Sequence, residues 1–130
     1  TDVTADEKGA VLQILNSFGK AEIVSESVMD AVTAVSGSSP AYIYMFIEAM
    51  ADAAVRGGMT RDLAYIFASQ SVLGSAKMVL ETGKHPGELK DMVCSPGGTT
   101  IDAVAVLEET GFRNSVMKAM EACIEKSKSM

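Results

Sequence analysis

The stretch AYIYMFIEAMADAAVRGGMTRDLAYIFASQSVLGSAKMVLETG, residues 41–83, decides the fold of this chain. Positions 41–56 are apolar almost all round, and residues 63–76 carry no charge. Gly57-Gly58 separates these runs, so the pattern predicts two long helices joined by a turn. A helix that is apolar on most faces must be buried, either centrally or at an interface.

The composition favours an all-α protein of one domain. The chain has 130 residues, of which 48% are hydrophobic and only 5% aromatic, with nine Met and no Trp. A net charge of −6 argues against nucleic acid as a partner, because binding phosphates requires a concentrated basic surface. We find neither a signal peptide nor an uninterrupted apolar run of about 18 residues, so we expect a cytoplasmic protein with no membrane span. Cys94 and Cys123 lack metal-ligand spacing and are expected to be free thiols.

The N-terminal part predicts a helix followed by a strand. Thr4 and Glu7 have the spacing of a capping box, and apolar residues recur at helical intervals until Gly19. The run AEIVS, residues 21–25, predicts a short strand. A solitary strand leaves its backbone groups unpaired, so it needs a sheet from another chain or from a domain that has been removed. The start at Thr1, without Met, also suggests a truncated beginning.

The rest of the chain predicts helices only. Ser39 is expected to cap a helix that starts at Pro40, and Thr60 to cap the helix that Gly83 ends. Helices so long and apolar predict self-association, since a chain of this size cannot cover all of their surface alone. Further helices are expected over residues 29–35, 87–93, 100–110 and 112–126.

The run SPGGTT, residues 95–100, is the candidate functional site. Its proline fixes one backbone angle, and its glycines permit positive φ and close approach of a ligand. The threonines then open a helix whose first N–H groups can hold a carboxylate or phosphate, with Thr99 and Asp102 in a capping-box relation. An ordinary glycine-rich connection between helices explains the same pattern, and spacing alone favours that interpretation.

Other candidate residues favour structural roles. Glu48 and Asp52 are spaced for acid–base or metal chemistry, but Arg56 one turn later favours an ion-pair stripe. His85, the single histidine, has no Cys or carboxylate cluster around it in sequence, and we expect no metal site. The chain contains no G-x-G-x-x-G or G-x-x-x-x-G-K-S/T phosphate loop and no pattern of a catalytic triad.

Three long motifs carry a resemblance to a known family. AVSGSSPAYIYMFIEAMADAAVRGGM (34–59), AKMVLETGKHPGELKDMV (76–93) and SPGGTTIDAVAVLEETGFR (95–113) resemble the C-terminal part of pyrroline-5-carboxylate reductases. The piece 4–25 is similar to the last helix and strand of that family's nucleotide-binding domain. The resemblance thus covers essentially the whole chain. It departs from the family at Ser39, where many members carry glycine.

The resemblance implies a fold, an activity and partners. The family reduces 1-pyrroline-5-carboxylate to L-proline with NADPH or NADH, which a Rossmann domain binds. That domain's glycine-rich loop is absent from this sequence. The family's helical domain, of the 6-phosphogluconate dehydrogenase C-terminal type, interlocks with its twin in a homodimer, and some members assemble dimers into decamers. We therefore expect residues 1–26 to end the nucleotide-binding domain and 27–130 to form the dimerisation and substrate domain, inactive without the rest.

The resemblance also implies site residues. Thr100 is expected to be the catalytic residue, with its hydroxyl near the ring nitrogen of the substrate. The residues expected to hold the substrate carboxylate are Ser95, Gly97, Gly98 and Thr99. The residues expected near the nicotinamide are Ser36, Gly37, Ser38 and Pro40. Two alternatives remain: a helical dimerisation module that binds no ligand, and a regulatory domain that binds a small anion.

Overall fold

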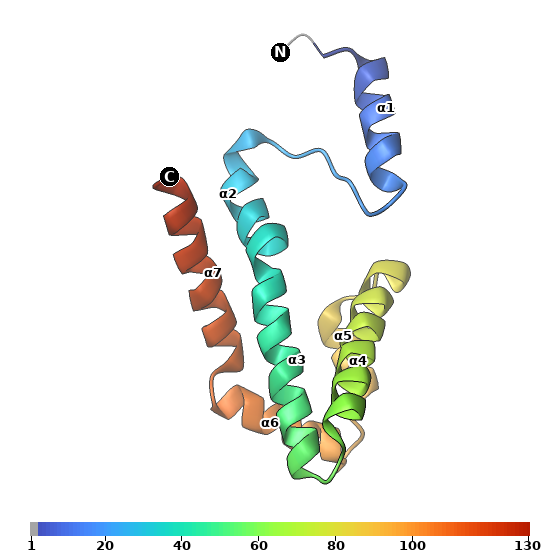
Figure 1. Cartoon of the computed structure of the whole chain (residues 1–130), viewed down its shortest axis with the longest axis vertical. Coiled ribbons are helices and arrows are strands. Elements are labelled where there is room, and N and C mark those ends of the chain that lie inside the picture. The colour runs from blue at the N-terminus through green and yellow to red at the C-terminus, as the bar shows by residue number, and fades with distance from the viewer. Residues whose placement is uncertain (1–2) are drawn as a thin grey trace.

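The computed structural model describes residues 3–130, and over that range it contains helices and loops but no strand. The expectation of an all-α fold is confirmed (Figure 1). Two long helices and a third that runs beside them form the body of the protomer. The elements in chain order are α1 (Ala5–Asn16), the 3₁₀ turn η1 (Glu26–Val28), α2 (Met29–Val32), the π-helical segment η2 (Thr33–Ser38), α3 (Ser39–Arg56), α4 (Arg61–Thr82), α5 (Pro86–Met92), α6 (Thr99–Glu109) and α7 (Phe112–Lys128).

Helix α1 stands apart from the body at the end of an extended segment (Figure 1). Its predicted capping box is confirmed: the Glu7 amide donates to Thr4 Oγ1 at 3.3 Å, and the Thr4 amide donates to Glu7 Oε2 at 2.8 Å. The predicted strand over 21–25 is not seen in the described part of the chain, where this segment has no strand beside it. A strand is defined by hydrogen bonds to a neighbour, so a β-like sequence alone does not make one.

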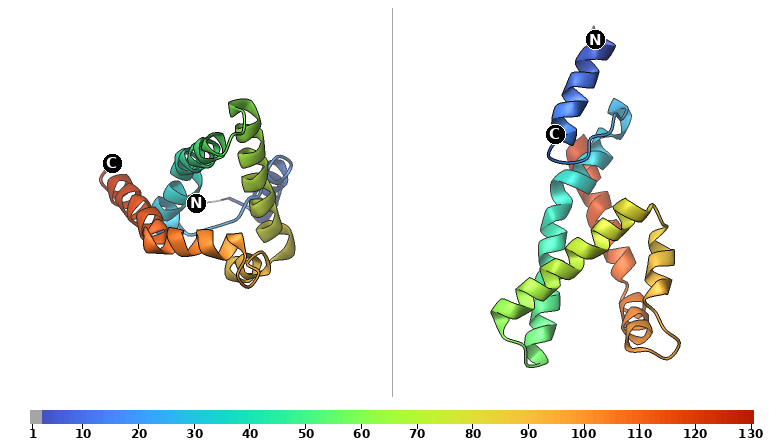
Figure 2. Two further views of the ribbon diagram at one scale, coloured as in Figure 1. Left: turned by 90° about the horizontal axis from the view of Figure 1, so that it is seen from below. Right: turned by 90° about the vertical axis from the view of Figure 1, so that its right-hand side faces the viewer.

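Helices α3 and α4 form the predicted hairpin. Gly57 ends α3, and Gly58 takes a φ of 98° that a residue with a side chain would rarely adopt. Ala51 and Ala64 lie where the two helices pack against each other, and the exposed fractions of these residues are only 0% and 1%. Such small side chains let the backbones approach closely at the crossing seen in the right-hand view of Figure 2.

Helix α7 packs in the opposite direction along the run formed by α2, η2 and α3. Phe112, at the start of α7, meets Phe46 of α3 with the ring centroids 5.9 Å apart. Further along, Ser127 donates a hydrogen bond of 2.6 Å to Asp30 of α2. α7 therefore lies against this helical run from Asp30 to Phe46.

The protomer has a very small core and a very large surface. The core within the described residues consists of Ala34, Ala51, Ala64 and Ala68, with no large side chain fully buried. The accessible surface is 10218 Å² for a mass of 13.6 kDa. A compact monomer of that mass exposes roughly 6,600 Å², so the protomer exposes about 3,600 Å² more than expected. An excess of this size is typical of a protomer that belongs to an obligate oligomer.

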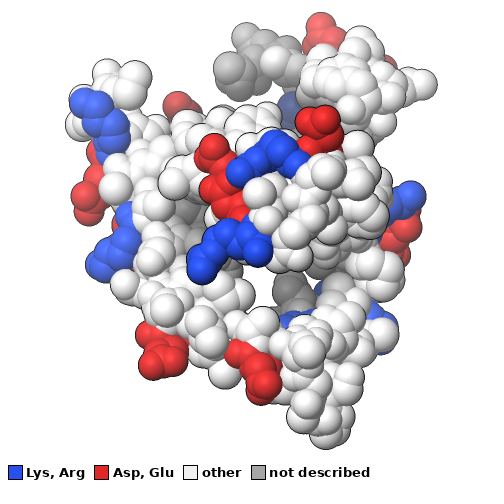
Figure 3. All heavy atoms as spheres, turned by 60° about the horizontal axis from the view of Figure 1, so that its bottom comes forward, with Lys and Arg blue, Asp and Glu red and all other residues white. Residues whose placement is uncertain are grey.

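Lys, Arg, Asp and Glu are scattered over the face shown in Figure 3, with wide uncharged surfaces separating them. The large apolar side chains that stand out include Ile43 (41% exposed), Met45 (68%), Ile66 (63%), Phe67 (62%) and Leu73 (61%).

By its length and composition alone, helix α4 meets the criterion for a helix that can cross a membrane. It has 22 residues, and its most apolar 18-residue window has a mean hydropathy of 1.3. The sequence expectation missed this because it required an unbroken apolar run, and Ser69, Gln70, Ser71 and Ser75 interrupt this one. A helix buried inside an oligomer has the same length and composition, so this measure does not separate the two cases.

Candidate functional site

The Ser95–Gly98 segment is a type II β-turn. The Gly98 amide donates to the Ser95 carbonyl at 3.0 Å, which closes the turn. Pro96 occupies the second position, where its fixed φ is favourable, and Gly97 occupies the third with a φ of 66°. The SPGG sequence therefore has a specific structural reason, and the turn directs the chain straight into α6.

The turn delivers a helix N-terminus without a side-chain cap. Gly98 is the N-cap residue of α6, and within the described chain no side chain bonds to this helix start. The predicted capping box of Thr99 with Asp102 is therefore wrong, because Thr99 is the first helical residue rather than the cap. The first N–H groups of a helix have no partner within it, so those of Thr99 and Thr100 remain available to a ligand.

A side chain at position 98 would make tight contacts with Ser95. A Cβ there would lie 3.2 Å from the Ser95 carbonyl oxygen and 3.4 Å from Ser95 Oγ, closer than nearly all real Cβ contacts. Gly97 is different, because a Cβ there would meet open space and only its positive φ selects glycine. Ser95, Gly97, Thr99 and Thr100 are all exposed in the protomer.

The cations that flank this turn in sequence are already paired. Lys90 lies 2.6 Å from Asp91, whose hydrogen bond raises the pKa of the lysine, and Arg113 lies 2.6 Å from Glu108. Asp102 adds a carboxylate to the first turn of α6. An anion at this end of α6 is therefore to be held by backbone amides and hydroxyls rather than by a free positive charge.

The second predicted segment, Ser36–Pro40, does not start a helix. The predicted cap at Ser39 is wrong, since α2, η2 and α3 form one continuous helical run. In a π-helix the carbonyl of residue i accepts from the amide of residue i+5, which for Val35 is Pro40, a residue without N–H. The Ser39 hydroxyl donates to the Val35 carbonyl instead, and so replaces the missing amide.

The serine hydroxyls of this segment are used inside the helical run. The Ser36 hydroxyl donates to the Val32 carbonyl at 2.8 Å. The Ser38 hydroxyl accepts from the Cys123 thiol at 3.1 Å. Ser36, Gly37 and Pro40 are the exposed residues of the predicted set, so a cofactor ring against this segment would meet these three.

The structure does not bring the two predicted segments together within one protomer. Figure 1 places η2 near the top of the helical run and the start of α6 at its bottom. The 18 residues of α3 separate them, a length of about 27 Å at 1.5 Å per residue. If both belong to one site, they must come from different copies.

The remaining candidates have structural roles. Asp52 pairs with Arg61 of α4, and not with Arg56 as the sequence suggested. His85 is the N-cap residue of α5, where its Nδ1 accepts from the Gly87 amide at 3.0 Å. Across residues 3–130 we find no group of three His, Cys, Asp or Glu side chains placed to hold a metal.

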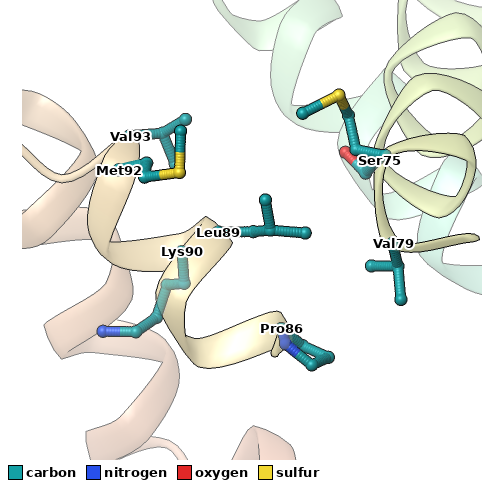
Figure 4. Close-up of a pocket in the computed structure, with 8 residues that line it drawn as sticks. Ser75, Val79, Pro86, Leu89, Lys90, Met92 and Val93 are labelled. Atoms are coloured by element: carbon teal, nitrogen blue, oxygen red, sulfur yellow. The ribbon is translucent and has the colours of Figure 1, made fainter. Parts of the chain in front are cut away.

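An apolar groove of about 360 Å³ lies between α4 and α5. Leu89 projects from α5 into the space opposite Ser75 and Val79 of α4 (Figure 4). The lining is mostly apolar, with Ser75 and Lys90 as its polar residues, so the groove suits another apolar side chain. Sequence periodicity did not reveal it, because α5 has only seven residues.

Together, the apolar helices and the minimal core define an all-helical association domain that also carries a helix N-terminus without a side-chain cap. A family model described as pyrroline-5-carboxylate reductase dimerisation matches residues 26–130. The chain belongs to this family.

Relatives agree with the family match over the whole chain. The pyrroline-5-carboxylate reductase of Escherichia coli (strain K12) is 64% identical over 98% of this chain and 48% of its own length. That of Methanosarcina acetivorans is 54% identical over 99% of the chain and 48% of its own length. The chain thus spans about half the length of these curated relatives.

Solved structures show the same architecture. A pyrroline-5-carboxylate reductase from Coxiella burnetii superposes with a TM-score of 0.91 at 38% identity, covering 98% of this chain and 47% of that one. The pyrroline carboxylate reductase of Plasmodium falciparum with NADP bound gives a TM-score of 0.88 at 40% identity, covering 99% and 52%.

Proposed function

We propose that this chain is the dimerisation and substrate-binding part of a pyrroline-5-carboxylate reductase, which reduces 1-pyrroline-5-carboxylate to L-proline. The observation that carries the proposal is the type II turn that delivers an uncapped, hydroxyl-flanked helix N-terminus at residues 95–100. Family membership adds that proteins carrying this domain are named as such reductases.

In this proposal the start of α6 binds the substrate carboxylate. The free amides of Thr99 and Thr100 point out of the helix, and the positive end of the helix dipole favours an anion there. The Ser95 hydroxyl lies beside Gly98 and adds a further polar group. The glycines allow the carboxylate to approach the backbone without meeting a Cβ.

The Thr100 hydroxyl orients the ring nitrogen of the substrate. Threonine neither needs to be ionised nor changes charge near neutral pH, which suits an imine that already carries its proton. A nicotinamide, NADPH or NADH, supplies the hydride when it is bound, mainly by a domain outside this chain. Positioning alone can contribute on the order of 7 kcal/mol to such a reaction, so the absence of His or Cys at the site is no obstacle.

The active protein in this proposal is a homodimer. The surface excess of the protomer and the separation of the two segments by α3 both support a site completed by a second copy. Residues 1–26 then end a dinucleotide-binding domain, and the family match from residue 26 supports that boundary. The free thiols Cys94 and Cys123 fit a reducing compartment such as the cytoplasm.

A titration tests the carboxylate site. L-Proline added to the chain should shift the backbone amide signals of residues 97–100, whereas pyrrolidine, the same ring without a carboxylate, should not. A chain whose amides ignore millimolar proline would be a dimerisation module without a ligand. Equal shifts with proline and acetate would instead favour a general anion site.

Two further measurements test the homodimer and the need for a dinucleotide-binding domain. Light scattering should give a dimer, and a stable monomer at micromolar concentration would contradict the homodimer. The chain alone should not oxidise NADPH in the presence of substrate, while a longer protein that joins it to a dinucleotide-binding domain should.

A further inference from the structure

The thiol of Cys123 lies against the turn of helix where the backbone ladder is interrupted. Cys123, on α7, donates a hydrogen bond of 3.1 Å to Ser38 Oγ, at the last residue of the π-helical segment. On the other side of Pro40, burial and the neighbouring Cys123 thiol raise the pKa of the Tyr42 phenol. One side chain of α7 thus bonds to the helical run two residues before Pro40.

This contact lies where the backbone hydrogen bonds of the helix alone hold its register weakly. Pro40 gives no amide to the ladder, and a π-helical turn is less stable than an α-helical one. The Ser39 hydroxyl satisfies the Val35 carbonyl from within the same helix, so it cannot fix the segment relative to its surroundings. The bond to Ser38 does, because it comes from another helix, 85 residues away in sequence.

We propose that Cys123 is a positioning residue, whose hydrogen bond to Ser38 fixes the π-helical register of residues 33–38 and thereby the surface that Gly37 and Pro40 offer to the nicotinamide. The inference rests on the proposed function for its catalytic consequence. Its structural part, that α7 holds the register, stands independently.

A second bond between the same helices provides a matched control. Ser127 lies one turn beyond Cys123 on α7, and it donates to Asp30 of α2, outside the π-helical segment. Removing this bond also weakens the contact between α7 and the helical run. It does not touch the residues on either side of Pro40.

The experiment uses a longer protein in which this chain follows a dinucleotide-binding domain. Cys123→Val keeps the volume of the side chain and removes the donor, Cys123→Ser restores a donor, and Ser127→Ala is the control. For Cys123→Val we expect kcat to fall by about tenfold or more, with KM for the carboxylate substrate unchanged. We also expect faster hydrogen exchange of the backbone amides in residues 36–41.

Cys123→Ser should recover much of both properties, and Ser127→Ala should change neither. Cys123→Val behaving like Ser127→Ala in kcat or in exchange would overturn the proposal. A Cys123→Val protein with a raised KM for the substrate and an unchanged kcat would overturn the proposal as well. Should Cys123→Val give no folded protein, Cys123→Ala is measured with the same readouts and the same criteria.

The two proposals fail in different ways. An unsubstituted protein without reductase activity contradicts the proposed function, and the exchange measurement still decides whether Cys123 holds the register. An active protein whose exchange and kcat ignore Cys123 contradicts only the positioning role.

Discussion

Replacing Ile66 by alanine tests whether the exposed face of α4 is buried by a second copy. Ile66 is 63% exposed in the protomer and lies in the uncharged stretch of α4, residues 63–76. The substitution removes three carbons, worth about 2.4 kcal/mol when fully buried, at about 0.8 kcal/mol each. Scaled by the exposed fraction, the loss is about 1.5 kcal/mol per protomer, or about 3 kcal/mol per symmetric dimer.

Ile14 offers a control matched in residue type and exposure. It is also 63% exposed and also lies within a helix, but on α1, before the first residue of the family match. Ile14→Ala carries the same change in helix propensity. The difference in the free energy of unfolding between the two variants therefore reports how far Ile66 is buried between copies.

Urea unfolding at several protein concentrations measures the effect. The data are fitted to a folded dimer in equilibrium with two unfolded chains. In this fit Ile66→Ala should lower the free energy of unfolding of the dimer by about 3 kcal/mol, which is roughly a hundredfold in the dimer equilibrium constant. Ile14→Ala should change it little. Equal losses in both variants, or an unfolding midpoint that ignores protein concentration, would refute the reasoning.

Three further predictions concern the site and the first helix. Gly97→Ala should lower stability by about 1 kcal/mol or more, because alanine is strained at a φ of 66°, whereas Gly9→Ala in the open interior of α1 should not; thermal unfolding compares them. Thr100→Val in the longer protein should lower kcat about tenfold or more while proline still binds, with Thr110→Val at the other end of α6 as control. Full activity in Thr100→Val would remove that residue from the mechanism. The helix-cap hydrogen bonds of Glu7 lower its pKa below 4.5, so their contribution is present above that pH and is lost as the pH falls through the lowered value. Helix signals of α1 followed by NMR should weaken on acidification in that range, and in Glu7→Gln they should not.

Local signals in the sequence predicted much of the fold. Thr4 and Glu7 are three residues apart, and their capping box needs no other part of the chain. Gly83 ends α4 in the left-handed conformation, again a local matter. The hairpin of α3 and α4 follows from two apolar runs and a glycine pair, and the structure confirms it.

The predictions that failed involve either competition between local rules or partners that are distant in sequence. Ser39 and Pro40 form a good helix-start signal, but the preceding helix continues through them, since the Ser39 hydroxyl supplies the donor that Pro40 lacks. Asp52 finds Arg61 across the turn of the hairpin, a contact that spacing along one helix cannot reveal. At the candidate site, the SPGG sequence predicted the turn and the open helix start. The role of Thr99 was misjudged by one position, which lies within the usual uncertainty of a helix boundary.

The π-helical segment has a consequence for how the chain tolerates insertions and deletions. Asp30 and Ser38 are eight residues apart, a spacing that in a regular α-helix turns the second side chain by about 80° away from the first. A π turn absorbs one residue, so the two behave like neighbours seven apart and both face α7, where Ser127 and Cys123 meet them. Deleting one residue from this segment would leave Asp30 and Ser38 seven apart in a regular α-helix, still on the face toward α7, whereas a regular α-helix of unchanged length would turn one away from the other by about 80°. The π turn therefore lets this run carry one residue more than a regular α-helix while both of its contacts to α7 are kept.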